Sequence, residues 1–467
     1  MIGRGEIDSM AEKLGIHASA IQRDYVHGWL LALLYSSSAL ADRLILKGGN
    51  CLRKDYFENA RYSRDLDFTT PTSISNEELG RELNTICSLV ADQSGVVFDT
   101  TRTRVENKRR ADADKSISEA RLYFRDFYGK EDEVVLGVRL DVTQFDRTHL
   151  PIQGLALIHP YSDSNVCRAN IRCVKLEEIL ATKMRCLLQR RHIADLFDLV
   201  YATLVTREIE LSRSELLSTF FKITIFQSAP RIAKGLLIDL PYETLSGFWA
   251  KYISRPRESW FSFEKARENL FSFIEMLIPE PAIRDYSPTF FPSSLRNPIM
   301  EAANSLTMLM LRYDRVDRLI EPYELSFKIH RDGVAREYLY AYDTTGGGSS
   351  GPGLKTFLPG KVEALENTDR TFEPRFDVEL RKAGGAEAMG YFEGRQGPRR
   401  GLLTARSTGI RHIRRRTIVD YSTYGLEYTI ECSYCGRHFK RKAMNMKLNP
   451  HKDKYGNPCY GRVGFLT

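Results

Sequence analysis

The sequence predicts an α+β protein of several domains, and three observations support that class. Residues 5–40 and 174–205 carry apolar side chains at helical spacing. Within residues 134–145, VVLGVRLDVTQF, apolar and polar side chains alternate as in a β-strand. The chain has 467 residues, enough for about three domains of ordinary size. With 42% hydrophobic and 27% charged residues, its composition is that of a soluble globular protein rather than a disordered or membrane-embedded chain.

The most informative stretch is residues 44–70, LILKGGNCLRKDYFENARYSRDLDFTT. A short apolar run leads to Lys47 and two glycines, and a second short strand carries Asp65 and Asp67. Alternate side chains of a strand point the same way, so these carboxylates are expected to repel each other unless a cation compensates them. Magnesium, or manganese in its place, prefers such carboxylates together with substrate phosphates. The alternative is an ordinary solvent-facing strand edge.

The same stretch resembles a known family. A glycine pair, a spacer and Asp-x-Asp resemble nucleotidyltransferases with a polymerase-β-like palm, and KGGNCLRK followed by RYSRDLDF resembles the AbiEii/AbiGii toxin family. That family usually has a hydroxyl residue at the position of Asn50. The resemblance implies that a nucleoside triphosphate is held by Lys47, Gly48, Gly49 and Ser63, and that magnesium is held by Asp65 and Asp67.

Further secondary structure is expected after this motif. A helix capped by Ser75 or Asn76 should cover residues 71–94, and strands are expected over 96–104, 120–128 and 134–145. Asp141 is a polar residue in the middle of the last, β-branched strand. Palm transferases often hold a third carboxylate on a neighbouring strand, so Asp141 is the candidate third magnesium ligand, with a surface-facing aspartate as the alternative.

Residues 174–205 place Lys183 on the apolar face of a helix, where a lysine is costly unless it meets an anion. Asp195 and Asp198 stand three residues apart on the next helix and can face the same space. The resemblance implies that Lys183 contacts the nucleotide and that Asp195 or Asp198 orients the lysine or the attacking hydroxyl. A buried Lys–Asp salt bridge without catalytic function is the alternative.

Residues 295–380 change to β-rich sequence and resemble a WYL domain, a small SH3-like module that often senses nucleotides or nucleic acids. Glu337, Tyr338 and Leu339 stand where that family has Trp-Tyr-Leu, and the usual basic residue is Lys355 or Lys361. An interaction module without a small ligand is equally compatible with this sequence.

The C-terminal part is basic. Residues 381–417 hold ten Lys or Arg against two Glu, and residues 418–467 hold eight against four, whereas the first 380 residues have a net charge of −4. Such a tail on a near-neutral body favours a polyanionic partner such as RNA, although a solubilising linker has the same composition.

Four potential zinc ligands follow the basic stretch. Cys432 and Cys435 form a C-x-x-C pair, which His451 and Cys459 would complete as a structural zinc site, with His438 as the alternate ligand. Five other cysteines are scattered through the apolar body and are expected to be reduced thiols.

We therefore expect six segments: a helical lead-in (1–43), a nucleotidyltransferase palm (44–170), a helical lobe (171–290), a WYL-like β module (295–380), a basic flexible linker (381–417) and a zinc knuckle (418–467). No apolar run approaches the roughly 18 residues of a membrane span, so a cytoplasmic protein without membrane contact is expected. The resemblance implies transfer of a nucleoside monophosphate to an RNA acceptor, tRNA above all, growth arrest in phage defence, and a cognate antitoxin. The alternative function is a nucleic-acid or nucleotide sensor whose palm pocket binds without catalysis.

Overall fold

The structure is a computed structural model. It describes residues 2–108, 110–112, 116–128, 135–205, 211–282, 289–329, 334–346 and 350–384, and in the C-terminal part residues 428–432, 435, 437–441, 448–453, 458–459 and 464–466. The chain forms two compact units, residues 1–388 and 389–467. Most of the stretch predicted as a basic linker, residues 385–417, lies outside the described residues.

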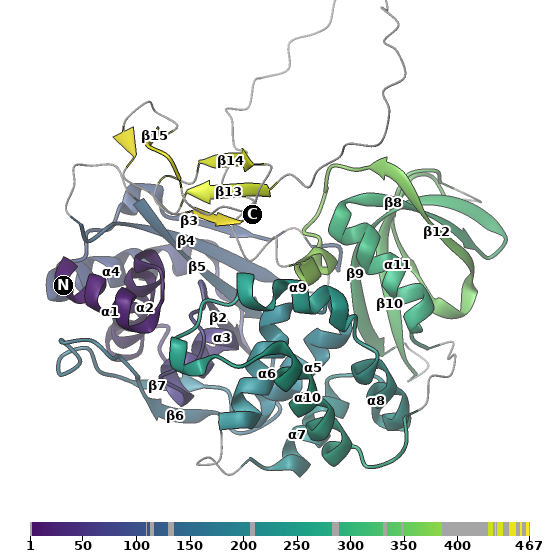
Figure 1. Ribbon diagram of the computed structural model, residues 1–467, viewed down its shortest axis with the longest axis horizontal. Helices are drawn as coiled ribbons and strands as arrows, with labels where there is room; N and C mark the ends of the chain where they lie inside the picture. The colour runs from purple at the N-terminus through teal and green to yellow at the C-terminus, as the bar shows by residue number, and fades with distance from the viewer. Residues whose placement is uncertain are drawn as a thin grey trace, which may run out of the picture. The chain divides into compact units, whose positions relative to one another are not determined.

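A mixed seven-stranded sheet is the centre of the first unit (Figure 1). Its strands, in spatial order, are β3 (Arg104–Asn107), β4 (Ile117–Arg125), β5 (Val135–Gln144), β2 (Asp65–Thr70), β1 (Ile45–Lys47), β7 (Asn170–Cys173) and β6 (Gln153–Ala156). The central strands β2 and β5 run parallel, and β1 pairs antiparallel with β2. Strand β7 pairs with β1, so the sheet extends beyond residue 170, where the sequence placed the end of the palm.

Helices α1 (Arg4–Leu14), α2 (Ala18–Ser37) and α4 (Asn76–Ser94) pack beside this sheet (Figure 1). Helix α2 is buried along most of its length, so the lead-in region is part of the palm core. Ser75 caps α4, as predicted, because its hydroxyl accepts from the Glu78 N–H at 3.1 Å. Between β1 and β2 lie the short helix α3 (Gly48–Cys51) and a π-helical turn, η1 (Leu52–Tyr56).

The strand predicted over residues 96–104 is wrong. Only Phe98 forms a bridge there, to Phe124, and the chain then turns through η2 (Thr100–Arg102) before β3 begins. The Thr101 hydroxyl donates to the Asp99 carboxylate at 2.6 Å. Such local side-chain bonds compete with strand pairing, which explains why the alternating pattern does not continue as a strand.

The helical lobe after the palm contains α5 (Leu176–Gln189), α6 (Ile193–Val205), α7 (Arg213–Lys222), α8 (Pro230–Ile238), α9 (Tyr242–Tyr252) and α10 (Phe263–Leu277). Its core is aromatic: the Phe197 ring lies 5.3 Å from the Phe261 ring and 5.6 Å from the Trp249 ring, centroid to centroid. Short 3₁₀ turns η4 (Phe226–Ser228) and η5 (Arg257–Ser259) connect these helices.

A second core supports the β module. Helix α11 (Ser293–Ser305) packs against an antiparallel sheet with the order β11 (Gly353–Phe357), β10 (Ala335–Asp343), β9 (Val316–Ile329), β8 (Thr307–Tyr313) and β12 (Val362–Thr371), together with η6 (Pro359–Lys361) and η7 (Glu379–Gly384). Buried Glu337 accepts from Arg296 at 2.6 Å, and Arg296 donates to the Leu188 carbonyl of α5 at 2.7 Å. Arg296, held by Glu337, therefore joins the β module to the helical lobe.

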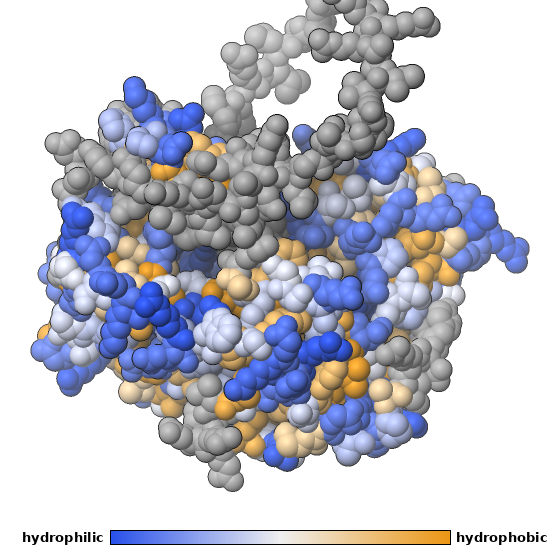
Figure 2. Space-filling model, viewed as in Figure 1, coloured by the Kyte–Doolittle hydropathy of each residue, from blue (hydrophilic) through white to orange (hydrophobic). Residues whose placement is uncertain are grey.

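The second unit is small. Strands β14 (His438–Arg441), β13 (Tyr428–Cys432) and β17 (Gly464–Leu466) form one sheet, and β15 (His451–Lys452) pairs with β16 (Pro458–Cys459). Figure 2 shows polar and apolar side chains interspersed over the visible face of the described residues. Among these residues no helix has the length and apolarity that crossing a bilayer requires.

Candidate active site

The two predicted carboxylates lie at the centre of the sheet, in a row of charged side chains. Strand register sets Lys47 of β1 opposite Asp67 of β2, Asp67 opposite Asp141 of β5, and Asp141 opposite Glu119 of β4. Asp65, two residues before Asp67, is on the same face. The structure thus brings Asp141 beside the D-L-D pair, where the sequence placed it, and adds Glu119.

This row concentrates negative charge. Burial, and then the neighbouring Asp141 and Asp65, raise the pKa of Asp67 above its ordinary value. Burial would also raise the pKa of Asp65, but Arg139 outweighs that effect and holds it below the ordinary value. A divalent cation beside Asp67 would relieve this repulsion, so the donor set fits the predicted magnesium site.

Two cations already contact the row. Lys108 Nζ lies 2.5 Å from Asp141 Oδ2 and 3.3 Å from Glu119 Oε2, and Arg139 is paired with Asp65. Sequence reasoning missed Glu119 and Lys108. The available signal was β4 itself, in which Glu119 and Arg121 alternate with buried Ala120 and Leu122.

The glycine turn lies directly against these carboxylates. Gly48 has φ +76°, and a Cβ atom there would stand 2.5 Å from Asp67 Oδ2. A Cβ at Gly49 would stand 2.7 Å from Arg61 Nη2 and 3.0 Å from Ser63 Oγ. Position 48 therefore favours glycine by its backbone conformation, whereas a side chain at position 49 would displace Arg61 and Ser63. The turn leaves its backbone close to Ser63 and Asp67, as a phosphate-binding turn needs.

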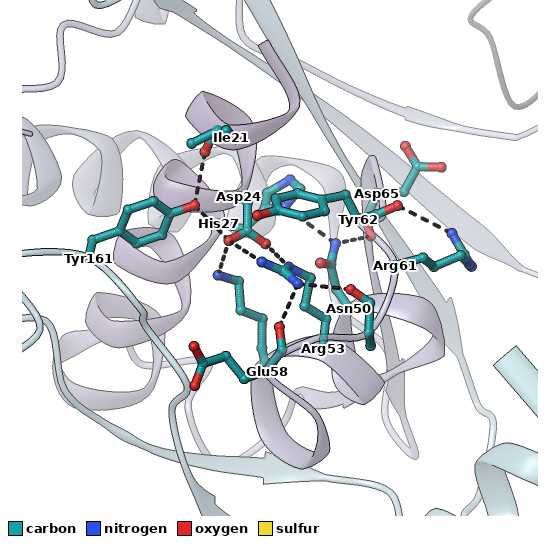
Figure 3. Close-up of polar contacts among 12 residues, drawn as sticks. Ile21, Asp24, His27, Asn50, Arg53, Glu58, Arg61, Tyr62, Asp65 and Tyr161 are labelled. Atoms are coloured by element: carbon teal, nitrogen blue, oxygen red, sulfur yellow. Dashed lines mark hydrogen bonds and ion pairs between the residues drawn. The ribbon is translucent and has the colours of Figure 1, made fainter. Parts of the chain in front are cut away.

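Asn50, the departure from the family pattern, has a structural function. Its side chain is fully buried and donates from Nδ2 to the Asp65 carbonyl at 2.7 Å, with His27 Nδ1 at 3.3 Å (Figure 3). Burial lowers the pKa of His27 to about 3, so its ring is neutral near pH 7. Asn50 thus fixes the backbone that presents Asp65.

Behind the turn lies a buried charge cluster, which the sequence did not reveal. Figure 3 shows the Asp24 carboxylate of α2 at its centre. Asp24 accepts from Arg53 Nε at 2.6 Å, Lys54 Nζ at 2.8 Å and the Tyr161 hydroxyl at 2.8 Å. The Arg53 guanidinium also covers the Tyr62 ring at 3.6 Å from its centroid. This cluster ties α2 to the π-helical turn that follows the glycines.

Lys183 lies in a second buried network. Its Nζ is 3.0 Å from Asp195 Oδ1 and 2.8 Å from Asp198 Oδ2. Arg61 pairs with Asp198 through two bonds of 2.7 and 2.8 Å, and Arg190 pairs with Asp195. Burial alone would lower the pKa of Lys183, but Asp198 and Asp195 raise it, so the lysine is charged.

This network holds three cations against two carboxylates. Lys183 lies close enough to offset a small part of the rise in the pKa of Asp67. The predicted Lys–Asp pairing is therefore present for both aspartates.

The four zinc candidates of the second unit come together. The ligand atoms of Cys432, Cys435, His451 and Cys459 all lie within 4.8 Å of one another, whereas His438 is not a member of this group. His451 Nδ1 lies 2.9 Å from the Asn449 carbonyl, which leaves Nε2 to face Cys435 Sγ at 3.4 Å. Three thiolates and one oriented imidazole are a donor set that fits structural zinc.

Carboxylates on adjacent strands, a glycine turn and a cationic lobe define a nucleotidyltransferase class of site. The comparison with family models agrees, since residues 29–234 match the nucleotidyl transferase AbiEii toxin of type IV toxin–antitoxin systems. This part of the chain is an AbiEii-type nucleotidyltransferase toxin domain.

Among solved structures, the chain is similar to MenT4, a nucleotidyltransferase toxin from Mycobacterium tuberculosis H37Rv. The two are 17% identical with a TM-score of 0.37, over 60% of this chain and 91% of that one. No curated protein matches the chain. The WYL-like module and the zinc knuckle have no counterpart among these matches and stay predictions from the sequence.

Proposed function

We propose that the protein transfers a nucleoside monophosphate from a nucleoside triphosphate to an RNA acceptor, with tRNA as the acceptor of choice. The observation that carries this proposal is the contact of the Gly48 turn with Asp67, in a row that also holds Asp141. Growth arrest in phage defence and control by a cognate antitoxin belong to the same proposal, because the domain is that of a type IV toxin.

The residues have separate functions in this proposal. Gly48, Gly49 and Ser63 receive the triphosphate oxygens, and the surplus positive charge around Lys183 balances the charge of the β- and γ-phosphates. Asp195 and Asp198 keep Lys183 charged and in place. A divalent ion held by Asp65, Asp67 and Asp141 would neutralise charge on the triphosphate and the leaving pyrophosphate.

The test is incubation of the whole protein with each labelled triphosphate, magnesium or manganese, and bulk tRNA. We expect label to enter RNA with wild type and to fall about 10²–10³-fold with Asp67→Asn, the scale for loss of a central electrostatic group. Asp92→Asn, at an exposed position of α4, is the matched control and should leave transfer unchanged. Equal transfer by Asp67→Asn and wild type would refute the proposal.

One observation favours the alternative, a sensor with a binding-only palm. Lys108 and Arg139 compensate Asp141 and Asp65 without any metal ion, as a non-catalytic site would require. Such a protein would bind RNA tightly and with strong salt dependence yet transfer no nucleotide from any triphosphate.

We further propose that the basic C-terminal part captures the acceptor. Deletion of residues 389–467 leaves the first compact unit intact, so the domain should still fold. The KM for tRNA should rise and its salt dependence should flatten, because fewer counterions are released, whereas kcat should change much less. Unchanged RNA affinity and salt slope would instead assign this part to contact with a protein partner.

A further inference from the structure

Phe145 stands out at the end of strand β5. It has φ 56°, in the left-handed region, and is the only aromatic residue with a positive φ among the described residues. That conformation is costly for a bulky side chain, and glycine would adopt it freely. Phe145 is also 65% exposed, so packing offers little compensation. An exposed aromatic ring on a strained backbone indicates that the ring has a function other than packing.

The backbone on both sides of Phe145 is firmly held. The side-chain amide of the preceding Gln144 donates from Nε2 to the Ile74 carbonyl at 3.0 Å. The following Asp146 donates its N–H to the Thr70 carbonyl at 3.1 Å and accepts from Thr69 Oγ1 at 2.9 Å. Further on, the N–H groups of His149 and Leu150 donate to the Glu178 carboxylate of α5. The ring is therefore presented from an anchored loop.

Cations surround this loop. Lys47 Nζ, next to Asp67 in the strand register, lies 3.0 Å from Asp146 Oδ2. Burial would raise the pKa of Asp146, but Lys47, and in smaller measure Thr69 and Arg185, hold it below the ordinary value. Arg185 Nε is buried and has no hydrogen-bond partner among the described residues. An aromatic face with neighbouring cations is the composition of a nucleotide-binding surface.

The position along the sheet indicates which nucleotide binds there. The turn of Gly48 and Gly49, with Ser63, lies at the Asp65 end of β2, whereas Phe145 follows β5 beyond Thr70, at the opposite end. The Asp67–Asp141 pair lies between them. In phosphoryl-type transfer the attacking and leaving oxygens are in line, on opposite sides of the reacting phosphorus. If pyrophosphate leaves on the glycine side, the acceptor arrives on the Phe145 side.

We propose that Phe145 is the stacking platform for the terminal base of the acceptor strand, and that Lys47, which the family resemblance assigns to the triphosphate, lies beside the acceptor's phosphate instead. Phe145 follows Asp141 by four positions, ~13 Å along an extended strand, a distance that a nucleotide bridges from its sugar hydroxyl to its base. This proposal rests on the proposed transfer reaction and states where the acceptor binds in it.

The first experiment measures transfer kinetics of the whole protein with bulk tRNA. Phe145→Ala should raise the KM for tRNA by about 5- to 150-fold, the equivalent of ~1–3 kcal/mol of stacking, and leave the KM for the triphosphate unchanged. Phe145→Trp should retain wild-type KM. Val166→Ala, at an exposed apolar position outside the site, is the control and should behave as wild type.

Phe145→Gly separates binding from folding. It removes both the ring and the backbone strain, so its melting temperature should rise while its KM for tRNA increases as in Phe145→Ala. A purely structural residue would not produce that combination. An unchanged KM for tRNA in both variants would overturn the proposal, and an increase confined to the KM for the triphosphate would assign the ring to the donor base instead.

A second readout does not depend on turnover. An oligoribonucleotide ending in 4-thiouridine, irradiated with Asp67→Asn protein, should crosslink to the peptide that contains Phe145, and the adduct should be lost in the Asp67→Asn, Phe145→Ala double variant. Crosslinking without transfer by wild type would refute the proposed reaction alone. Transfer by wild type without the crosslink would refute the subsite alone.

Discussion

Replacement of Asp24 by Asn tests whether the buried cluster behind the glycine turn holds the palm together. Arg53 and Lys54 have side chains only 3% and 1% exposed, and both donate to the Asp24 carboxylate. Asn would leave two buried cations without an anion. Removal of one partner from a buried ion pair typically costs ~3–5 kcal/mol, and we expect a loss of unfolding free energy of that size for Asp24→Asn.

The assay is urea unfolding followed by tryptophan fluorescence. The three tryptophans, Trp29, Trp249 and Trp260, all lie in the first unit, so the signal reports that unit alone. Asp317→Asn, which removes an exposed partner of Arg312, is the control and should leave the midpoint unchanged. A second change, Lys54→Met, should restore part of the loss in the Asp24→Asn background, because it removes one uncompensated charge.

The pH dependence of the unfolding free energy provides an independent test of the stabilisation by Asp24. Burial would raise the pKa of Asp24, but Arg53 and Lys54 hold it well below the ordinary value of 3.8. A lowered pKa contributes stability above 3.8 that is lost as the pH falls below it. The difference between wild type and Asp24→Asn should therefore be full at pH 7 and shrink below about pH 4. A midpoint for Asp24→Asn equal to that of the Asp317→Asn control at pH 7 would refute the reasoning.

Three further predictions concern other buried groups. Asp55 is buried beside the Cys51 and Cys173 thiols, and burial raises its pKa well above 3.8. The native state is therefore penalised increasingly as the pH rises above 3.8, so Asp55→Asn should raise the urea midpoint at pH 8 and have less effect at pH 4. Lys183→Met should reduce kcat for transfer by about 10²–10³-fold. Lys222→Met, at an exposed position of α7, is the control and should leave kcat unchanged. Equal kcat values for the two variants would show that Lys183 is structural only. Cys459→Ser should lower the zinc content of purified protein by one ion per chain in elemental analysis, and Cys87→Ser, at a buried cysteine outside the group, should not.

The sequence predicted those features that depend on local spacing. Asp65 and Asp67 were predicted to share a face because strand alternation fixes it, and Lys183 was predicted to be buried because helical periodicity fixes that. Glu119 and Lys108 were missed because their proximity to Asp141 depends on which strands pair. Local pattern carries no information about strand neighbours, so a row across four strands becomes visible only in the folded sheet.

Arg53 and Lys54 show a second limit. In sequence they are two adjacent cations in a polar segment, a pattern typical of a solvated helix face. Their partner Asp24 lies about thirty residues earlier, on a helix that was predicted only as a lead-in. The pairing required α2 to enter the core. Composition alone does not distinguish a helix that enters the core from one that covers it.

Asn50 allows the departure from the family pattern to be tested directly. Its amide reaches the Asp65 carbonyl, a contact that the shorter hydroxyl of Thr at the same backbone position would not make without movement of β2. Asn50→Thr leaves that partly buried carbonyl without the Asn50 donor, at a cost of ~1 kcal/mol of unfolding free energy, and frees the backbone that presents Asp65. Both the urea midpoint and kcat for transfer should therefore fall, whereas a residue that only contacts phosphate would change KM for the triphosphate and leave stability intact. A wild-type midpoint with a raised KM would show that position 50 serves the substrate, as in the family pattern, rather than the strand.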